Sequence, residues 1–173
     1  MPIYPFNHRI PQINSSSYVH PQAIIIGDVI VGSECFVGPG AVLRGDFGKI
    51  IVGNGSVIQD NCIIHTDPEC ITIIESYVII GHGAIVHGPS RLHAYSSVGM
   101  GSIVSVNCEL ESKSLLAAGS ILPPRKTVEK RTIAAGNPAR KIREMDEQMI
   151  LNHKKAVESY NKLVEQYKQN EKK

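Results

Sequence analysis

The sequence predicts an all-β solenoid, a parallel β-helix of hexapeptide repeats, followed by a C-terminal α-helix. Two observations predict the solenoid: aliphatic residues recur every six positions, and a small or β-branched residue follows most of them four positions later. A change to helical periodicity near residue 143 predicts the helix. Period six fits neither a helix nor simple strand alternation, and it is typical of coils with three short strands each.

The repeat is uninterrupted over its C-terminal half. Its aliphatic positions there are Ile74, Ile80, Val86, Leu92, Val98, Val104, Leu110, Leu116 and Leu122. The same register occurs earlier, over residues 19–43 and again over residues 52–64. Three strands of six residues make a coil of eighteen, and successive coils stack about 4.8 Å apart. The pattern does not fix handedness, and the general crossover rule favours a right-handed path.

The chain is expected to divide into four segments: an N-terminal extension (1–17), the β-helix (18–122), a connector (123–142), and the C-terminal helix with its tail (143–173). Pro123 and Pro124 are expected to end strand pairing, because proline has no N–H for the ladder. One face of the expected helix is lined by Met145, Met149, His153, Ala156, Tyr160, Leu163 and Tyr167. We expect it to pack back along the prism or against a neighbouring subunit.

Composition and charge exclude several functions. A net charge of +2 on 173 residues is too small to indicate nucleic-acid binding. No apolar stretch approaches the roughly 20 residues of a membrane span, and residues 1–17 show no secretion signal pattern. Cys35, Cys62 and Cys108 occupy the small position of the repeat, which predicts buried thiols. No close Cys-x-x-Cys pair exists, which disfavours zinc-thiolate and redox sites, and we expect a cytoplasmic protein. From its charge and hydropathy we expect no nucleic-acid or membrane partner.

The spacing of two histidines predicts that they lie in one column. His65 and His87 each follow an aliphatic position, and they are one coil apart once four extra residues before Ile74 are allowed for. Arg44 joins the same column after correction for a three-residue insertion. Two imidazoles rooted about 4.8 Å apart can converge on one ion, with metal–nitrogen bonds of about 2.1 Å.

A third histidine lies on a different part of the coil. His82 comes five residues before His87, on the preceding face, and is not expected to complete that site within one chain. Three-fold packing would bring His82 of one subunit beside His65 and His87 of its neighbour. The spacing therefore indicates a homotrimer with intersubunit metal sites. Zn2+ is the expected ion, and imidazole ligands also suit Fe2+ or Co2+. The alternative is a set of ordinary surface histidines.

The motifs around these residues resemble the γ-class carbonic anhydrase family of hexapeptide-repeat proteins. The resemblance covers roughly residues 10–145 and rests on Val42-Leu43-Arg44-Gly45-Asp46, Ile58-Gln59-Asp60-Asn61, His65, and Gly81-His82-Gly83-Ala84-Ile85-Val86-His87-Gly88. The phrases Leu43-Arg44-Gly45-Asp46-Phe47-Gly48 and Met1-Pro2-Ile3-Tyr4 are most similar to the phenylacetate-degradation and carnitine-operon branch.

This resemblance implies a left-handed helix and a homotrimer. It implies zinc held by His65 and His87 of one subunit with His82 of the next. It further implies that Gln59 orients a metal-bound hydroxide. Ion pairs at the subunit boundary are implied for Arg44, Asp46 and Asp60.

Three imidazoles with an open position lower the pKa of bound water to roughly 7, which permits attack on carbon dioxide or a thioester. Gln59 precedes His65 by one face-length, so its amide is expected to point at the open side of the metal. Phe47 stands where the archetypal enzymes carry a proton-transferring carboxylate, which disfavours fast hydration. We therefore expect a zinc-dependent hydrolase of coenzyme A thioesters, of the phenylacetate-degradation branch, with weak activity on CO2.

Three alternatives stay open: a γ-class carbonic anhydrase proper acting on CO2 and bicarbonate, a hexapeptide acyltransferase, and a non-catalytic trimeric accessory protein. Arg140, Lys141 and Arg143 could serve the phosphates of coenzyme A, although a solvated basic cluster is the simpler interpretation.

Overall fold

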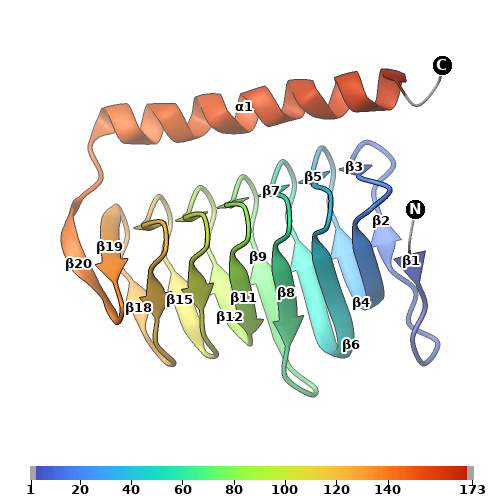
Figure 1. The fold of residues 1–173 in the computed structure, drawn as a ribbon, viewed down its shortest axis with the longest axis horizontal. Coiled ribbons are helices and arrows are strands. Elements are labelled where there is room, and N and C mark those ends of the chain that lie inside the picture. The colour runs from blue at the N-terminus through green and yellow to red at the C-terminus, as the bar shows by residue number, and fades with distance from the viewer. Residues whose placement is uncertain (1–2, 171–173) are drawn as a thin grey trace.

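The computed structural model describes residues 3–170. It is a left-handed parallel β-helix with one long helix lying along it, which confirms the predicted fold class (Figure 1). The coils stack into a three-sided prism. No helix among residues 3–170 combines the length and apolar character needed to cross a membrane.

The prism has three faces, which we number by their order in each coil. Face 1 consists of β8 (Ile63–Thr66), β11 (Ile85–Gly88), β14 (Ile103–Val104) and β17 (Ile121–Leu122). Face 2 consists of β9 (Ile71–Ile74), β12 (Ser90–Leu92), β15 (Cys108–Leu110) and β18 (Thr127–Val128). The long strands β4 (Ile24–Val31) and β6 (Val42–Val52) run through both faces, and β1 (Ile3–Tyr4) and β2 (Gln12–Ile13) pair with β4. Face 3 consists of β3 (Tyr18–Val19), β5 (Phe36–Val37), β7 (Val57–Ile58), β10 (Ile79–Ile80), β13 (Ser97–Val98), β16 (Leu115–Leu116) and β19 (Thr132–Gly136), with β20 (Ala139–Glu144) antiparallel to β19.

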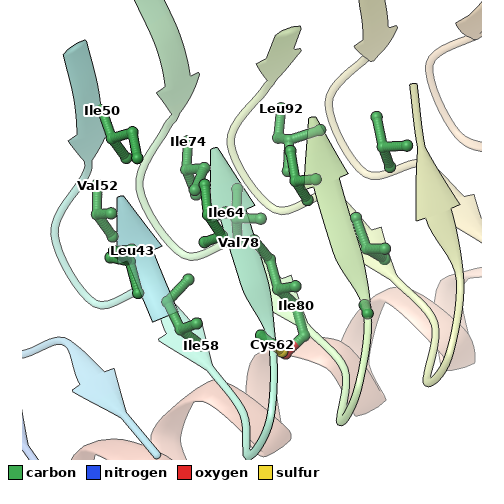
Figure 2. Close-up of a cluster of buried hydrophobic side chains, with 14 of the residues drawn as sticks. Leu43, Ile50, Val52, Ile58, Cys62, Ile64, Ile74, Val78, Ile80 and Leu92 are labelled. Carbon is green, nitrogen blue, oxygen red and sulfur yellow. The ribbon is translucent and has the colours of Figure 1, made fainter. Parts of the chain in front are cut away.

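The six-residue period builds the core. Ile58, Ile64 and Ile74 are fully buried, and they stack inside the prism on their counterparts from neighbouring coils (Figure 2). Burying each such side chain contributes about 1.5–3 kcal/mol. The small position fills the corners of the prism, and the prediction of buried thiols there is confirmed for Cys35, Cys62 and Cys108. Burial raises the pKa of the Cys62 thiol to about 11, so this group stays protonated.

The solenoid continues beyond the expected end of the repeat. β18 pairs with β15, and β19 pairs with β16. The prediction that Pro123 and Pro124 end strand pairing is wrong, because both lie in the turn between β17 and β18, where no ladder N–H is required. Val128 and Ala134 keep the six-residue period, and both are buried in the core. The segment expected as a connector therefore contains the last coil.

Helix α1 (Glu147–Asn170) packs back along face 3 of its own chain, which was one of the two expected arrangements (Figure 1). Its N-terminus is capped by Asp146, whose Oδ1 accepts a hydrogen bond of 2.8 Å from the Met149 N–H. The buried positions, Ile150, Val157 and Val164, are seven residues apart.

A second series with the same spacing flanks these positions. His153 bonds to Ser97 and Tyr77, Tyr160 bonds to Gln59, and the Tyr167 ring stacks on Tyr18. Seven helical residues advance about 10.5 Å, and two coils of the prism advance about 9.6 Å. The helix therefore meets equivalent points on every second coil.

Candidate functional site

The column predicted from the repeat is present. Strand register places Arg44 opposite His65, and His65 opposite His87. The two imidazole rings are stacked, with centroids 5.5 Å apart and planes inclined by 28°. The column lies where face 1 turns into face 2, on the outward side of β6, β8 and β11. We call this the paired-histidine edge.

A carboxylate lies beside each ring. His65 Nε2 lies 3.1 Å from Asp46 Oδ1, and Asp46 Oδ2 accepts a hydrogen bond of 2.6 Å from Arg44 Nη1. Burial opposes ionisation of Asp46, but the bonds from Arg44 and His65 outweigh it and hold the pKa of this carboxyl below its usual range. His87 Nε2 lies 3.6 Å from Asp67 Oδ1. Arg44 and Asp46, two of the residues for which ion pairs were implied, thus pair with each other within one chain.

An aromatic ring forms one wall of this edge. Phe47 is 53% exposed, and its apolar ring lies beside the polar side chains of His65 and Arg44. Its ring centroid is 5.4 Å from that of His65, and the Arg44 guanidinium carbon lies 6.0 Å from it. The edge therefore combines imidazoles with an apolar surface.

The third histidine lies at the opposite border of face 1. His82 sits in the turn between β10 and β11, where Gly83 has a φ of 67°, a backbone conformation that favours glycine. His82 Nδ1 lies 3.1 Å from Asp60 Oδ2, and the His82 N–H donates a bond of 3.0 Å to Gln59 Oε1. Gln59 therefore shares this edge with His82. Whether its amide points at the open side of a metal shared between subunits stays a prediction. We call this border the single-histidine edge.

Sequence reasoning missed one contact at this edge. Gln59 Nε2 donates a hydrogen bond of 2.7 Å to Tyr160 Oη, so helix α1 reaches the candidate site. Burial raises the pKa of the Tyr160 phenol, which keeps its hydroxyl protonated at neutral pH. The available indication in the sequence was the heptad spacing of His153, Tyr160 and Tyr167, which marks Tyr160 as a docking residue.

The metal donors of one chain form an incomplete set. Within residues 3–170, no group of three or more His, Cys, Asp and Glu side chains is placed to hold an ion. The paired-histidine edge offers two imidazoles, whereas zinc sites with an open position use three protein ligands. Neighbouring carboxylates such as Asp46 and Asp67 are usual companions of histidine ligands. The residues fit a metal if a second copy supplies the third imidazole.

Two of the three basic residues considered for coenzyme A phosphates have carboxylates within ion-pair distance. Lys141 Nζ lies 3.4 Å from Glu129 and 2.5 Å from Glu144, and Arg143 lies 3.6 Å from Asp146. These pairs favour the interpretation of an ordinary solvated cluster for Lys141 and Arg143.

The fold and its edges define a hexapeptide-repeat β-helix protein. Residues 11–45 match the bacterial transferase hexapeptide family (six repeats). A hexapeptide transferase family protein from Anaplasma phagocytophilum is 41% identical, with a TM-score of 0.91 over 95% of this chain and 97% of that one. The chain therefore belongs to the hexapeptide transferase family.

Two further similarities concern individual relatives. A Bacillus cereus protein, described provisionally as an acetyltransferase, is 32% identical, with a TM-score of 0.94 over 96% of each chain. Carnitine operon protein CaiE of Escherichia coli O157:H7 is 49% identical over 88 residues, which are 51% of this chain and 45% of that protein. The match spans less than half the length of this curated relative. It agrees with the carnitine-operon part of the expected resemblance.

Proposed function

We propose that the chain is one subunit of a homotrimeric, metal-dependent hydrolase acting on a coenzyme A thioester and, more weakly, on CO2. One observation carries this proposal. His65 and His87 lie in register on one border of face 1, and His82 lies on the other border. Three copies that meet through face 1 would set each paired-histidine edge against the next copy's single-histidine edge.

An apolar stripe on face 1 supports this assembly. Six aliphatic residues point outward in register along it: Ile24, Val42, Ile63, Ile85, Ile103 and Ile121. Ile63 is 45% exposed in the single chain. A continuous apolar patch of this kind is typical of an interaction surface. Joining the edges would also bring Arg44 and Asp46 near the partner's Asp60.

When bound, zinc supplies Lewis-acid activation of water and of a carbonyl oxygen near neutral pH, and iron or cobalt are possible substitutes. The chain's own residues bind the metal and orient the reacting groups. Asp46 contacts the ring of His65 at hydrogen-bond distance, and Asp67 lies close to the ring of His87. Gln59 is fixed by the His82 N–H and by Tyr160, which leaves one of its two amide protons free to orient an attacking water or a substrate oxygen.

The exposed Phe47 ring favours a thioester over CO2. It offers an apolar surface beside His65 for the acyl group of a larger substrate. Carbon dioxide has no group that needs such a surface.

The test combines native mass spectrometry, metal analysis and a thioesterase assay on zinc-loaded protein. We expect a trimer with one metal per chain and hydrolysis of an acyl-coenzyme A. His87→Ala should lose both metal and hydrolysis, because it leaves two imidazoles where a zinc site with an open position needs three protein ligands. His93→Ala is the matched control, since His93 lies near Glu75 and away from both histidine edges. A metal-free monomer, or full metal content in His87→Ala, would contradict the proposal.

Acyl transfer is the second candidate, favoured by the similarity to the Bacillus cereus protein. It predicts release of coenzyme A that depends on an added amine acceptor, whereas hydrolysis proceeds without one. If the metal-loaded trimer catalyses neither reaction, the accessory role expected for a carnitine-operon relative becomes the better proposal.

A further inference from the structure

A cavity of about 350 Å³ lies at the C-terminal end of the prism, far along the chain from the histidine edges. Its floor is the C-terminal end of the hydrophobic core, formed by Leu122, Val128, Ala134 and Ala139, none of which is more than 6% exposed. The volume falls at the lower end of the range typical of small-molecule sites. A long cofactor would not fit inside it, but a small ligand would.

Backbone donors point into this end of the prism. One coil earlier, the Glu109 N–H donates to the Lys126 carbonyl and the Glu111 N–H donates to the Val128 carbonyl. The equivalent groups in the last coil are the N–H groups of Thr127 and Glu129, and both residues line the cavity. Because β18 is the last strand of its sheet, no following coil accepts hydrogen bonds from them.

The rim of the cavity is positively charged. Lys126 and Arg140 line it, and within residues 3–170 neither side chain has a carboxylate within ion-pair distance. Lys141 also lines the cavity, but Glu129 and Glu144 neutralise it. Two cations without an ion-pair partner and two backbone N–H groups therefore border one cavity with an apolar floor.

We propose that this cavity binds a small carboxylate that carries a short hydrocarbon chain. The carboxylate would accept hydrogen bonds from Lys126, Arg140 and the two N–H groups, and bonds to a charged acceptor are the stronger kind. The hydrocarbon would lie against this apolar floor, where its own surface leaves water. This site is independent of the proposed hydrolase function, because it shares no residue with either histidine edge.

The test uses the full chain with isotope-labelled alanine and valine methyl groups, observed by NMR. Three probes separate the contributions: sodium octanoate has both charge and chain, sodium acetate has charge alone, and 1-octanol has chain alone. We expect octanoate to shift the methyl signals of Val128, Ala134 and Ala139 at concentrations where acetate and octanol do not.

Paired variants test the charged rim. Lys126→Gln combined with Arg140→Gln should weaken octanoate binding roughly tenfold or more, because it removes two charge-assisted bonds. The matched control combines Lys130→Gln with Arg143→Gln, which removes two exposed cations that do not line the cavity, and it should bind like wild type. Unmoved methyl signals, or equal binding by the two double variants, would overturn the proposal. So would a result in which an extended peptide shifts the β18 amides and octanoate does not, since that indicates strand addition.

Discussion

At the scale of single residues, the Gln59–Tyr160 contact is the least expected feature of the candidate site. The two residues are 101 positions apart, and their 2.7 Å bond joins the helix to the single-histidine edge. The other end of the Gln59 amide is held by the His82 N–H. Both ends are thus fixed, so Tyr160 acts as a positioning residue for Gln59 in the proposed reaction.

Tyr160→Phe removes the acceptor of this bond and leaves the ring. We expect kcat for thioester hydrolysis to fall about tenfold, since one net hydrogen bond is worth about 0.5–1.5 kcal/mol. Metal content and trimer mass should not change. Tyr167→Phe is the control, because its ring stacks on Tyr18 away from Gln59. Equal kcat values for the two variants would show that Tyr160 does not position Gln59.

The sequence predicted residue positions wherever the repeat alone determines them. Arg44, His65 and His87 could be aligned by counting, because each coil adds a fixed number of residues once its insertions are known. Counting could not place the Gln59 amide, since its partner Tyr160 comes from an element outside the repeat. It also could not show that Asp67 would fold back towards His87 from the loop after β8.

At the scale of elements, His153 connects helix α1 to the prism. Its Nε2–H donates to the Tyr77 carbonyl and its Nδ1 accepts from the Ser97 hydroxyl, each over 2.8 Å. The Tyr77 carbonyl can only accept, which fixes a proton on Nε2, and the neutral ring is then able to accept from Ser97. Burial lowers the pKa of His153 below its ordinary value of 6.5.

This shift predicts a pH dependence of stability. As pH falls below about 6.5, His153 takes up a proton in the unfolded chain before it does so in the folded chain, so the free energy of unfolding decreases. Urea unfolding at pH 8 and pH 5.5 measures the change. His153→Gln should reduce the pH dependence, and His8→Asn, at an exposed position outside the helix interface, should not. An unchanged dependence in His153→Gln would contradict this assignment.

The boundaries of the elements were harder to predict than their type. The six-residue period continues through Val128 and Ala134, but Pro123 and Pro124 were interpreted as a stop. Proline ends strand pairing on a strand but not in a turn. Leu122 and Val128 are six residues apart, and this count alone places both prolines in the turn between two strands. The apolar side of α1 could be predicted from the sequence. The sequence did not show that this side packs on face 3 rather than on another face of the prism.

At the scale of the whole molecule, the three faces have different surroundings. Helix α1 covers face 3, whereas faces 1 and 2 are open to solvent in the single chain. Ile63 on face 1 and Ile71 on face 2 are exposed to nearly the same extent, 45% and 47%. In the proposed trimer, only Ile63 lies in the apolar stripe that becomes buried.

These two residues therefore make a matched pair. Ile63→Lys should convert the trimer to monomers and abolish metal binding, because three buried ammonium groups near one axis would lack partners. Ile71→Lys should leave a metal-containing trimer. Size-exclusion chromatography with light scattering measures both. A trimer that survives Ile63→Lys would place the subunit interface on another face.

The small mismatch between helix and prism limits how this architecture can grow. Each heptad of α1 overshoots two coils by about 0.9 Å, so the three docking points on Tyr167, Tyr160 and His153 drift by about 1.8 Å in total. Side-chain adjustments can accommodate an offset of this size, but the offset grows with every further heptad that docks on the prism. Duplication of one eighteen-residue repeat would separate Tyr18 from Ser97 by an extra coil and leave the helix out of phase at one end. Helix α1, which contains no hexapeptide repeat, therefore limits how many coils can be added to this prism.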